Sequence, residues 1–311
     1  MMEITLLGCA GAVPLPDRAL TSCVLTVGGR SILFDCGEGT QTSARRAGIN
    51  LMRVDVIALT HYHGDHIFGI PGLLQSMDLA GRTDPLYIVG PVRDGLSIEY
   101  ELSAVLALSG RPGYELRLLA MPAEGLDMRK LSGDWPHLSK LRAFSTVHRV
   151  CSQGYVFELG RRGRFLPEKA KETGVPVKLW NVLQNGEDIL FDGRTVRSAD
   201  VTGPERKGLK FVFSGDTGYC RQLADNASGA DLFVCESTYG DDDQSELAAG
   251  YGHMTFSQAG RAASEAGAAR LWLTHFSQRI RNPEEFMHFA REQFPDAEAG
   301  YDGKRISLQF E

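Results

Sequence analysis

The chain has 311 residues, 43% of them hydrophobic and 23% charged, and a formal net charge of −6. This composition is typical of a globular protein with a sizeable core and argues against unselective binding of nucleic acid. The N-terminus lacks the basic start of a signal peptide, and no run of about 18 apolar residues occurs. We therefore expect a cytoplasmic protein with no membrane segment, whose six unpaired cysteines are structural.

Strand-like and helix-like segments alternate along the chain. Apolar, β-branched runs of strand length occur at 22–27, 31–35, 54–60, 141–147, 210–214, 231–235, 270–274 and 306–310. Stretches with helical spacing lie between many of them, at 37–48, 67–81, 256–267 and 283–294. This alternation predicts a layered α/β domain.

Four of the predicted strands run into a potential metal ligand at their carboxyl ends. These residues are His61, His148, Asp216 and His275. Since α/β sheets keep their sites at the carboxyl ends of strands, we expect the four side chains to converge. Two of the junctions look alike, ALTH (58–61) and WLTH (272–275), which would suit a fold built from two similar halves.

The stretch THYHGDH (60–66) concentrates three imidazoles and a carboxylate in one short loop. Burying these groups without partners would be costly, so packing gives no reason for the cluster. His61, His63 and Asp65 alternate in sequence, and an extended backbone would turn them to one side, while Gly64 would let the chain bend and bring His66 round. Imidazole and carboxylate donors without a thiolate suit zinc in a catalytic site.

Residues from elsewhere in the chain can complete two coordination shells around this loop. They are His148, Asp216 and His275, with Asp216 placed to bridge two ions. Paired ions of this kind activate a water for phosphodiester hydrolysis, and the leaving oxygen then needs a proton. His253, just before a predicted helix start at Thr255 or Ser257, is the candidate general acid, whereas His137 and His288 are interpreted as structural.

The sequence resembles the ribonuclease Z (tRNase Z) family of the metallo-β-lactamase superfamily. The superfamily signature H-x-H-x-D-H occupies 61–66. The narrower family motifs follow in order along nearly the whole chain: LGCAGAVP (7–14), LFDCGEGTQ (33–41), THYHGDHIFGIPGLLQS (60–76), FSGDT (213–217), GHMT (252–255) and LTHFSQR (273–279).

The resemblance implies an αββα sandwich and a zinc-dependent endoribonuclease that removes the 3′ trailer of precursor tRNA, usually as a homodimer. It implies two zinc ions per chain, with manganese as the alternative metal. His61, His63, His148 and Asp216 would hold one ion, and Asp65, His66, Asp216 and His275 the other. Asp65 would be the proton acceptor, His253 would assist the leaving group, and Arg279 would lie near the RNA end.

The segment at about 160–187 departs from the family pattern. Many family members carry here a Gly/Pro-rich arm that clasps the tRNA, but this chain keeps only one proline in GVPVKLW (174–180). We expect a single domain over 1–311 with this segment inserted as a basic arm. Its cations form a surface suited to RNA phosphates, with Arg161, Arg162, Arg164 and Lys178 as candidate substrate contacts.

Three other functions remain open from the sequence. A phosphodiesterase of the same fold could act on another RNA or on a small phosphodiester, but a small substrate would not need the basic segment. A di-iron oxidoreductase of this fold generally has Glu where His63 stands, and a non-catalytic module should lack ligands, all seven of which are present.

Overall fold

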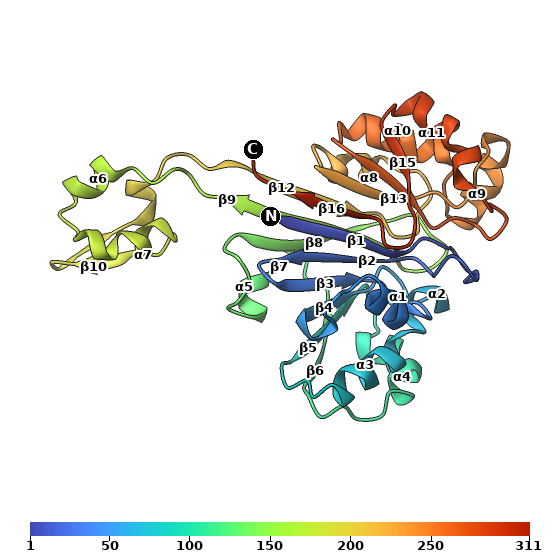
Figure 1. Cartoon of the computed structure of the whole chain (residues 1–311), viewed down its shortest axis with the longest axis horizontal. Helices are drawn as coiled ribbons and strands as arrows, with labels where there is room; N and C mark the ends of the chain where they lie inside the picture. The colour runs from blue at the N-terminus through green and yellow to red at the C-terminus, as the bar shows by residue number, and fades with distance from the viewer.

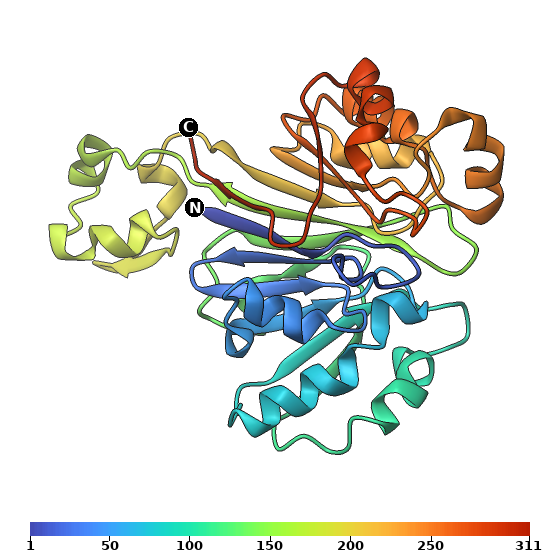
Figure 2. The ribbon, with the colours of Figure 1, turned by 45° about the vertical axis from the view of Figure 1, so that its right-hand side comes forward.

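Two seven-stranded β-sheets pack face to face in the computed structural model, which describes residues 1–311 (Figures 1 and 2). In the first sheet the strand order is β16 (Arg305–Leu308), β1 (Met2–Gly8), β2 (Ser22–Val27), β3 (Arg30–Phe34), β4 (Val54–Ala58), β5 (Leu86–Gly90), β6 (Leu116–Ala120). In the second sheet it is β15 (Ala297–Ala299), β14 (Leu271–Thr274), β13 (Leu232–Glu236), β12 (Arg206–Phe213), β9 (Gln153–Arg161), β8 (Ser139–Ser145), β7 (Leu126–Asp127).

Helices cover both outer faces of the pair of sheets. The first sheet carries α1 (Thr40–Arg46), α2 (Gly64–Ile67), α3 (Ile70–Leu79) and α4 (Ile98–Ala107). The second carries α8 (Arg221–Ala227), α9 (Ser245–Tyr251), α10 (Phe256–Ala266) and α11 (Met287–Gln293), and the short α5 (Met128–Leu131) precedes β8. The predicted αββα sandwich is therefore confirmed. In no helix does an apolar stretch reach the length needed to cross a membrane.

The two sheets share one pattern of strand directions. Antiparallel pairings join β1, β2 and β3 in the first sheet and β8, β9 and β12 in the second. Parallel pairings then run from β3 to β6 and from β12 to β15. In this order β14 corresponds to β5 rather than β4, so the similar junctions ALTH and WLTH do not occupy equivalent strands.

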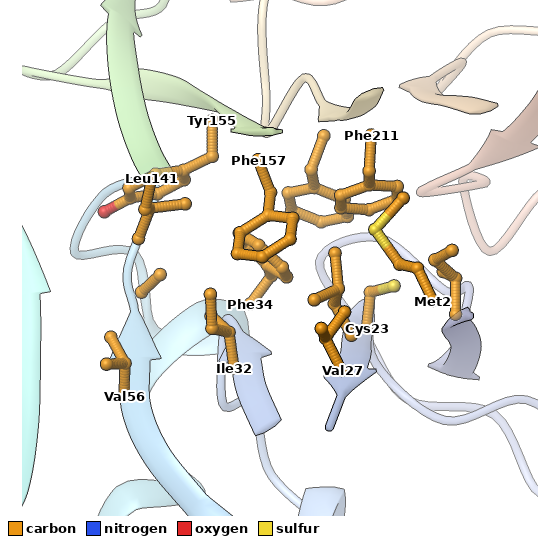
Figure 3. Close-up of a cluster of buried hydrophobic side chains, with 14 of the residues drawn as sticks. Met2, Cys23, Val27, Ile32, Phe34, Val56, Leu141, Tyr155, Phe157 and Phe211 are labelled. Carbon is orange, nitrogen blue, oxygen red and sulfur yellow. The ribbon is translucent and has the colours of Figure 1, made fainter. Parts of the chain in front are cut away.

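The main core lies between the two sheets (Figure 3). Phe34 of β3 is fully buried and packs against Tyr155 of β9 and Phe211 of β12, with ring centroids 5.6 and 5.4 Å apart. Truncating a buried Phe to Ala typically costs about 3–5 kcal/mol, so these rings fix how the sheets face each other. They thereby fix the distance between loops that leave different sheets.

Residues 162–205, between β9 and β12, project away from the sandwich (Figure 1). This projecting segment contains α6 (Pro167–Glu172), α7 (Trp180–Gln184) and the hairpin of β10 (Ile189–Phe191) and β11 (Arg194–Val196). It has a small core of its own, made by Ala170, Val175, Leu183, Val196 and Val201. The hairpin lies beyond 187, where the sequence pattern predicts the basic arm to end.

Candidate metal centre

The four strand ends singled out in the sequence meet at one rim of the sandwich. His61 follows β4 of the first sheet, whereas His148, Asp216 and His275 follow β8, β12 and β14 of the second. The His61, Asp216 and His275 side chains are buried, with exposed fractions of 0%, 3% and 2%. The centre is therefore built between the sheets rather than on one of them.

A first group of donor atoms gathers around His63. Its Nδ1 lies 3.0 Å from His61 Nε2 and 3.2 Å from His148 Nε2. Asp216 Oδ2 lies 3.7 Å from His61 Nε2 and 4.0 Å from His148 Nε2. Three imidazoles and one carboxylate thus turn lone-pair atoms toward a common point.

A second group forms on the other side of Asp216. His66 Nε2 lies 3.4 Å from Asp65 Oδ2 and 3.4 Å from Asp216 Oδ1. His275 Nε2 lies 3.5 Å from Asp65 Oδ2 and 3.2 Å from Asp216 Oδ2. Asp216 is the one carboxylate within reach of both groups, as expected for a bridging ligand.

The orphaned atoms of the site fit metal ions. His66 Nε2, His275 Nε2 and Asp216 Oδ1 are buried and have no hydrogen-bond partner. A tetrahedral zinc ion with ligands at about 2.0–2.2 Å requires ligand atoms roughly 3.3–3.6 Å apart. The separations in both groups lie close to that value, so the donor set and its spacing suit two cations.

The path of the chain through 61–66 differs from the extended path that the alternation predicts. The extended backbone ends at His63, and Gly64 begins the short helix α2, so that Asp65 and His66 lie in its first turn. A Cβ on Gly64 would meet the ring of Phe68, which is largely exposed and would have to move aside. The helical turn, rather than a bend in a strand, directs Asp65 and His66 into the second group.

Carboxylates and imidazoles at the centre shift one another's pKa values. Burial alone would raise the pKa of Asp216, but His275, His66 and His61 hold it well below its usual range. Asp65 behaves in the same way: burial opposes ionisation, and the nearby imidazoles of His275 and His66 lower its pKa overall. Both carboxylates are therefore ionised at neutral pH, the state in which they can coordinate a cation.

Partners outside the two groups orient the imidazoles. The Nδ1 atom of His66 lies 2.8 Å from Asp35 Oδ2, and His148 Nδ1 lies 2.9 Å from the carbonyl oxygen of Gly252. The hydroxyl groups of Thr60 and Thr238 stand 3.0 and 2.9 Å from the Nδ1 atoms of His61 and His275. Such contacts fix the tautomer that leaves Nε2 free to bind a metal.

Asp35→Asn is expected to lower the metal affinity of the second group by about 10–100-fold, the usual effect of losing an outer carboxylate partner. Asp35 is fully buried and also accepts hydrogen bonds from the backbone N–H and the hydroxyl of Thr60. Chelator competition would measure the affinity, and the melting temperature of the apoprotein would separate metal loss from general unfolding. Unchanged affinity would contradict the orienting role.

His253 lies beside both groups but turns one ring nitrogen away from them. Its ring stacks on His275, with centroids 5.4 Å apart, and its Nδ1 lies 2.8 Å from Glu236 Oε1. Burial alone would lower the pKa of His253, yet Glu236 raises it to about 9. The imidazole therefore holds a proton at neutral pH, which a general acid requires. The capping box at Thr255, which begins α10, fixes the chain beyond it.

The candidate substrate residues do not gather in one place. Arg279 is exposed and lines a hollow of about 400 Å³ beside His253 and His275. The other four lie at the base of the projecting segment or within it, away from the metal centre: Arg161, Arg162, Arg164 and Lys178.

Three orienting residues are not among those predicted from the sequence. Asp35 lies in LFDCGEGTQ, immediately after β3, and Glu236 ends β13, while Thr238 follows two residues later. The signal was present, because both carboxylates stand at carboxyl ends of central strands, as the proposed ligands do. Sequence spacing alone did not show that these carboxylates would contact imidazoles rather than metal.

Comparison with known proteins agrees with the geometry of the site. Residues 16–126 match the family model of the metallo-beta-lactamase superfamily, and residues 137–276 match that of a beta-lactamase superfamily domain. The chain is 40% identical over 313 residues to ribonuclease Z of Lachnoclostridium phytofermentans, covering 100% of this chain and 99% of that protein. It is also 40% identical over 315 residues to ribonuclease Z of Clostridium tetani, covering 100% of both chains.

A solved structure extends the comparison. The short form of human tRNase Z superposes with a TM-score of 0.67 at 25% identity, covering 99% of this chain and 100% of that one. The sandwich, the candidate metal-ligand groups and the full-length identity to these relatives point to the same family. The chain therefore belongs to the ribonuclease Z family of the metallo-β-lactamase superfamily.

Proposed function

We propose that this protein is a metal-dependent endoribonuclease that removes the 3′ trailer of precursor tRNA by hydrolysing one phosphodiester. The observation that carries the proposal is identity of up to 40%, over the whole chain, to proteins named ribonuclease Z. The converging donor atoms and the adjacent His253–Glu236 pair supply the groups that such a reaction needs.

The ions are proposed to be two zinc ions per chain, with manganese as the alternative. One ion would be held by His61, His63 and His148. The other would be held by Asp65, His66 and His275, and Asp216 would bind both. When bound, a pair of such ions lowers the pKa of water and neutralises charge on a phosphodiester. Imidazole and carboxylate donors without thiolate are the basis for choosing zinc.

The protein's own residues then manage the protons. Asp65 Oδ2 accepts a hydrogen bond of 2.8 Å from the backbone N–H of Ala12, which holds this carboxylate in place as the proton acceptor. His253, kept protonated by Glu236, would donate from Nε2 to the oxygen that leaves the phosphorus. In a cut that frees the 3′ end of tRNA, that oxygen is O3′ of the nucleotide before the scissile phosphate.

Substrate contacts are proposed at two distances from the cut. Arg279, in the hollow beside His253, would bind a phosphate next to the scissile one. The end of β9 and the projecting segment would together serve as a basic arm on a single metallo-β-lactamase-fold domain. They would contact the body of the tRNA through Arg161, Arg162, Arg164 and Lys178. We further propose a homodimer, to be checked by light scattering, and a cytoplasmic site of action, because the proposed substrate is an intracellular RNA.

The direct test compares a 3′-extended precursor tRNA with a small chromogenic phosphodiester, adding metal back to chelated protein. Metal-restored cleavage after the discriminator nucleotide is the expected result. Hydrolysis of the small diester alone would retain the metal centre and refute the tRNA assignment.

Replacing Arg161, Arg162 and Arg164 together by Gln should raise KM for precursor tRNA several-fold and leave hydrolysis of the small diester unchanged. The slope of log affinity against log salt should become shallower by about one for each phosphate that these side chains no longer bind. The melting temperature is the necessary control, since Arg161 stacks on Phe310 and Arg162 contacts His137. Equal loss on both substrates would show that the three arginines support the fold instead.

A further inference from the structure

A wide cleft lies at the end of the second sheet away from the metal centre. It has a volume of about 930 Å³ and opens on the outer face of the second sheet, between α5, the strands β8, β9 and β12, and the root of the projecting segment. The cleft lies along the first part of β12, as far as Lys210, and Asp216 follows the other end of this strand. Six positions, roughly 20 Å of extended chain, separate Lys210 from Asp216.

The lining of this cleft, which we call the root cleft, is strongly basic although the chain is acidic. Eight Lys and Arg side chains face four carboxylates. Two of these carboxylates already have partners, since Glu158 pairs with Arg142 at 3.4 Å and Asp231 with Lys207 at 3.4 Å. Lys130 and Lys140 are exposed and make neither an ion pair nor a side-chain hydrogen bond.

Cations in the root cleft also crowd one another. The imidazole of His137 lies between two guanidinium groups, with its Nε2 2.7 Å from Arg129 and its Nδ1 3.0 Å from Arg162. Burial lowers the pKa of Arg162, and the nearby Arg129 lowers it further. Packing like charges together costs free energy, which an anionic ligand would recover.

The projecting segment contributes its two end residues, Arg162 and Glu205, to the root cleft. A Cβ on Gly186 would collide with Nη1 of Arg162, so the guanidinium lies directly against the backbone of this segment. Arg161 and Arg162, at the start of the proposed arm, therefore share one lining with the basic residues of the sandwich, whereas Arg164 and Lys178 lie outside it. Apolar lining is confined to Leu138, Leu159 and Leu209, and the lining offers no aromatic side chain of Phe, Tyr or Trp on which a base could stack.

We propose that the root cleft binds the sugar–phosphate backbone of a folded part of the precursor tRNA, remote from the scissile bond. The proposal rests on the proposed function and adds a contact made by the sandwich itself, through Arg129, Lys130 and Lys140. Cations spread over a surface that offers no aromatic ring for stacking suit recognition of the RNA backbone and shape rather than of unpaired bases. The cleft lies along β12 away from the metal centre, so the RNA that occupies it would be a part remote from the scissile bond.

The test uses the full-length, metal-loaded protein and a 3′-extended tRNA with a non-cleavable linkage at the scissile position. Lys130→Gln combined with Lys140→Gln is expected to raise Kd about 3–10-fold and to reduce the slope of log Kd against log salt by about one to two. The matched control replaces Arg45 and Arg46 on α1 by Gln, since these two exposed cations also lack side-chain partners. That control should leave both quantities unchanged.

Further measurements distinguish folded tRNA from other anionic ligands, and they separate failure of this proposal from failure of the proposed function. A short single-stranded RNA with the same 3′ end should bind the Lys130 and Lys140 variant as it binds the wild type, and Lys140→Glu alone should weaken the binding of folded tRNA only. An unchanged salt slope, or an equal effect of the Arg45 and Arg46 control, would overturn the proposal. The proposal would also be overturned if pyrophosphate stabilised the protein through Lys130 and Lys140 while tRNA binding did not depend on these two lysines. Failure of the wild type to cleave precursor tRNA would instead refute the proposed function.

Discussion

Asp216→Asn is expected to remove both of the proposed metal ions and to abolish turnover. Asn preserves the shape of the side chain but not its charge, and Asp216 is the one carboxylate within 4.0 Å of donor atoms from both groups. The reduction in activity should exceed the 10–100-fold effect typical of removing an outer partner. Metal content by atomic emission, measured with kcat on precursor tRNA, checks both parts of the expectation.

Asp225→Asn is the matched control for this change, because Asp225 is an exposed carboxylate on α8. Asp65→Ala and His66→Ala should also abolish turnover and lower metal content, with His66→Ala acting on the second group alone. An Asp216→Asn protein that keeps two ions and full activity would refute the bridging assignment.

His253→Ala should reduce kcat by about 10²–10⁴-fold while leaving the metal content intact, the range expected for loss of a general acid. Glu236→Gln should have a smaller effect of the same kind. Glu236 raises the pKa of His253 to about 9, so without its charge the imidazole loses its proton at lower pH. The fall of kcat on the alkaline side should therefore move to lower pH in Glu236→Gln.

Two further results would decide between proton donation and structural support. The double variant should be no slower than His253→Ala, because Glu236 acts through that imidazole. A substrate whose leaving group needs no proton, such as a nitrophenyl phosphodiester, should be hydrolysed by His253→Ala nearly as fast as by the wild type. Loss of metal in His253→Ala would show instead that His253 is a ligand or a support for one.

The convergence of the proposed ligands could be predicted from sequence because each follows a recognisable strand. Apolar β-branched runs before His61 and His275 mark strands. Because sites in α/β proteins form at the carboxyl ends of strands, these two residues are expected to converge. The assignment of β4 and β14 to different sheets could not be predicted in this way. Only the packing of the sheets, set by rings such as Phe34, places those two strand ends together.

Other features depend on contacts that periodicity does not report. The helix α2 is four residues long, too short for any periodic signal, so the turn that directs Asp65 and His66 could not be predicted. The pairing of Asp35 with His66 spans 31 positions, and that of Glu236 with His253 spans 17. Such pairs can be recognised only once the fold of the sandwich is known.

The division of the metal centre between the two sheets has a consequence for a chain still being synthesised. Four of the proposed ligands lie between His61 and His66, but His148 and Asp216 are needed to complete the first group and His275 the second. A nascent chain that has folded only β1 to β6 of the first sheet offers an incomplete set to either proposed ion. Nuclease activity therefore has to await emergence of the second sheet from the ribosome, and no early fragment can cut RNA beside the site of translation.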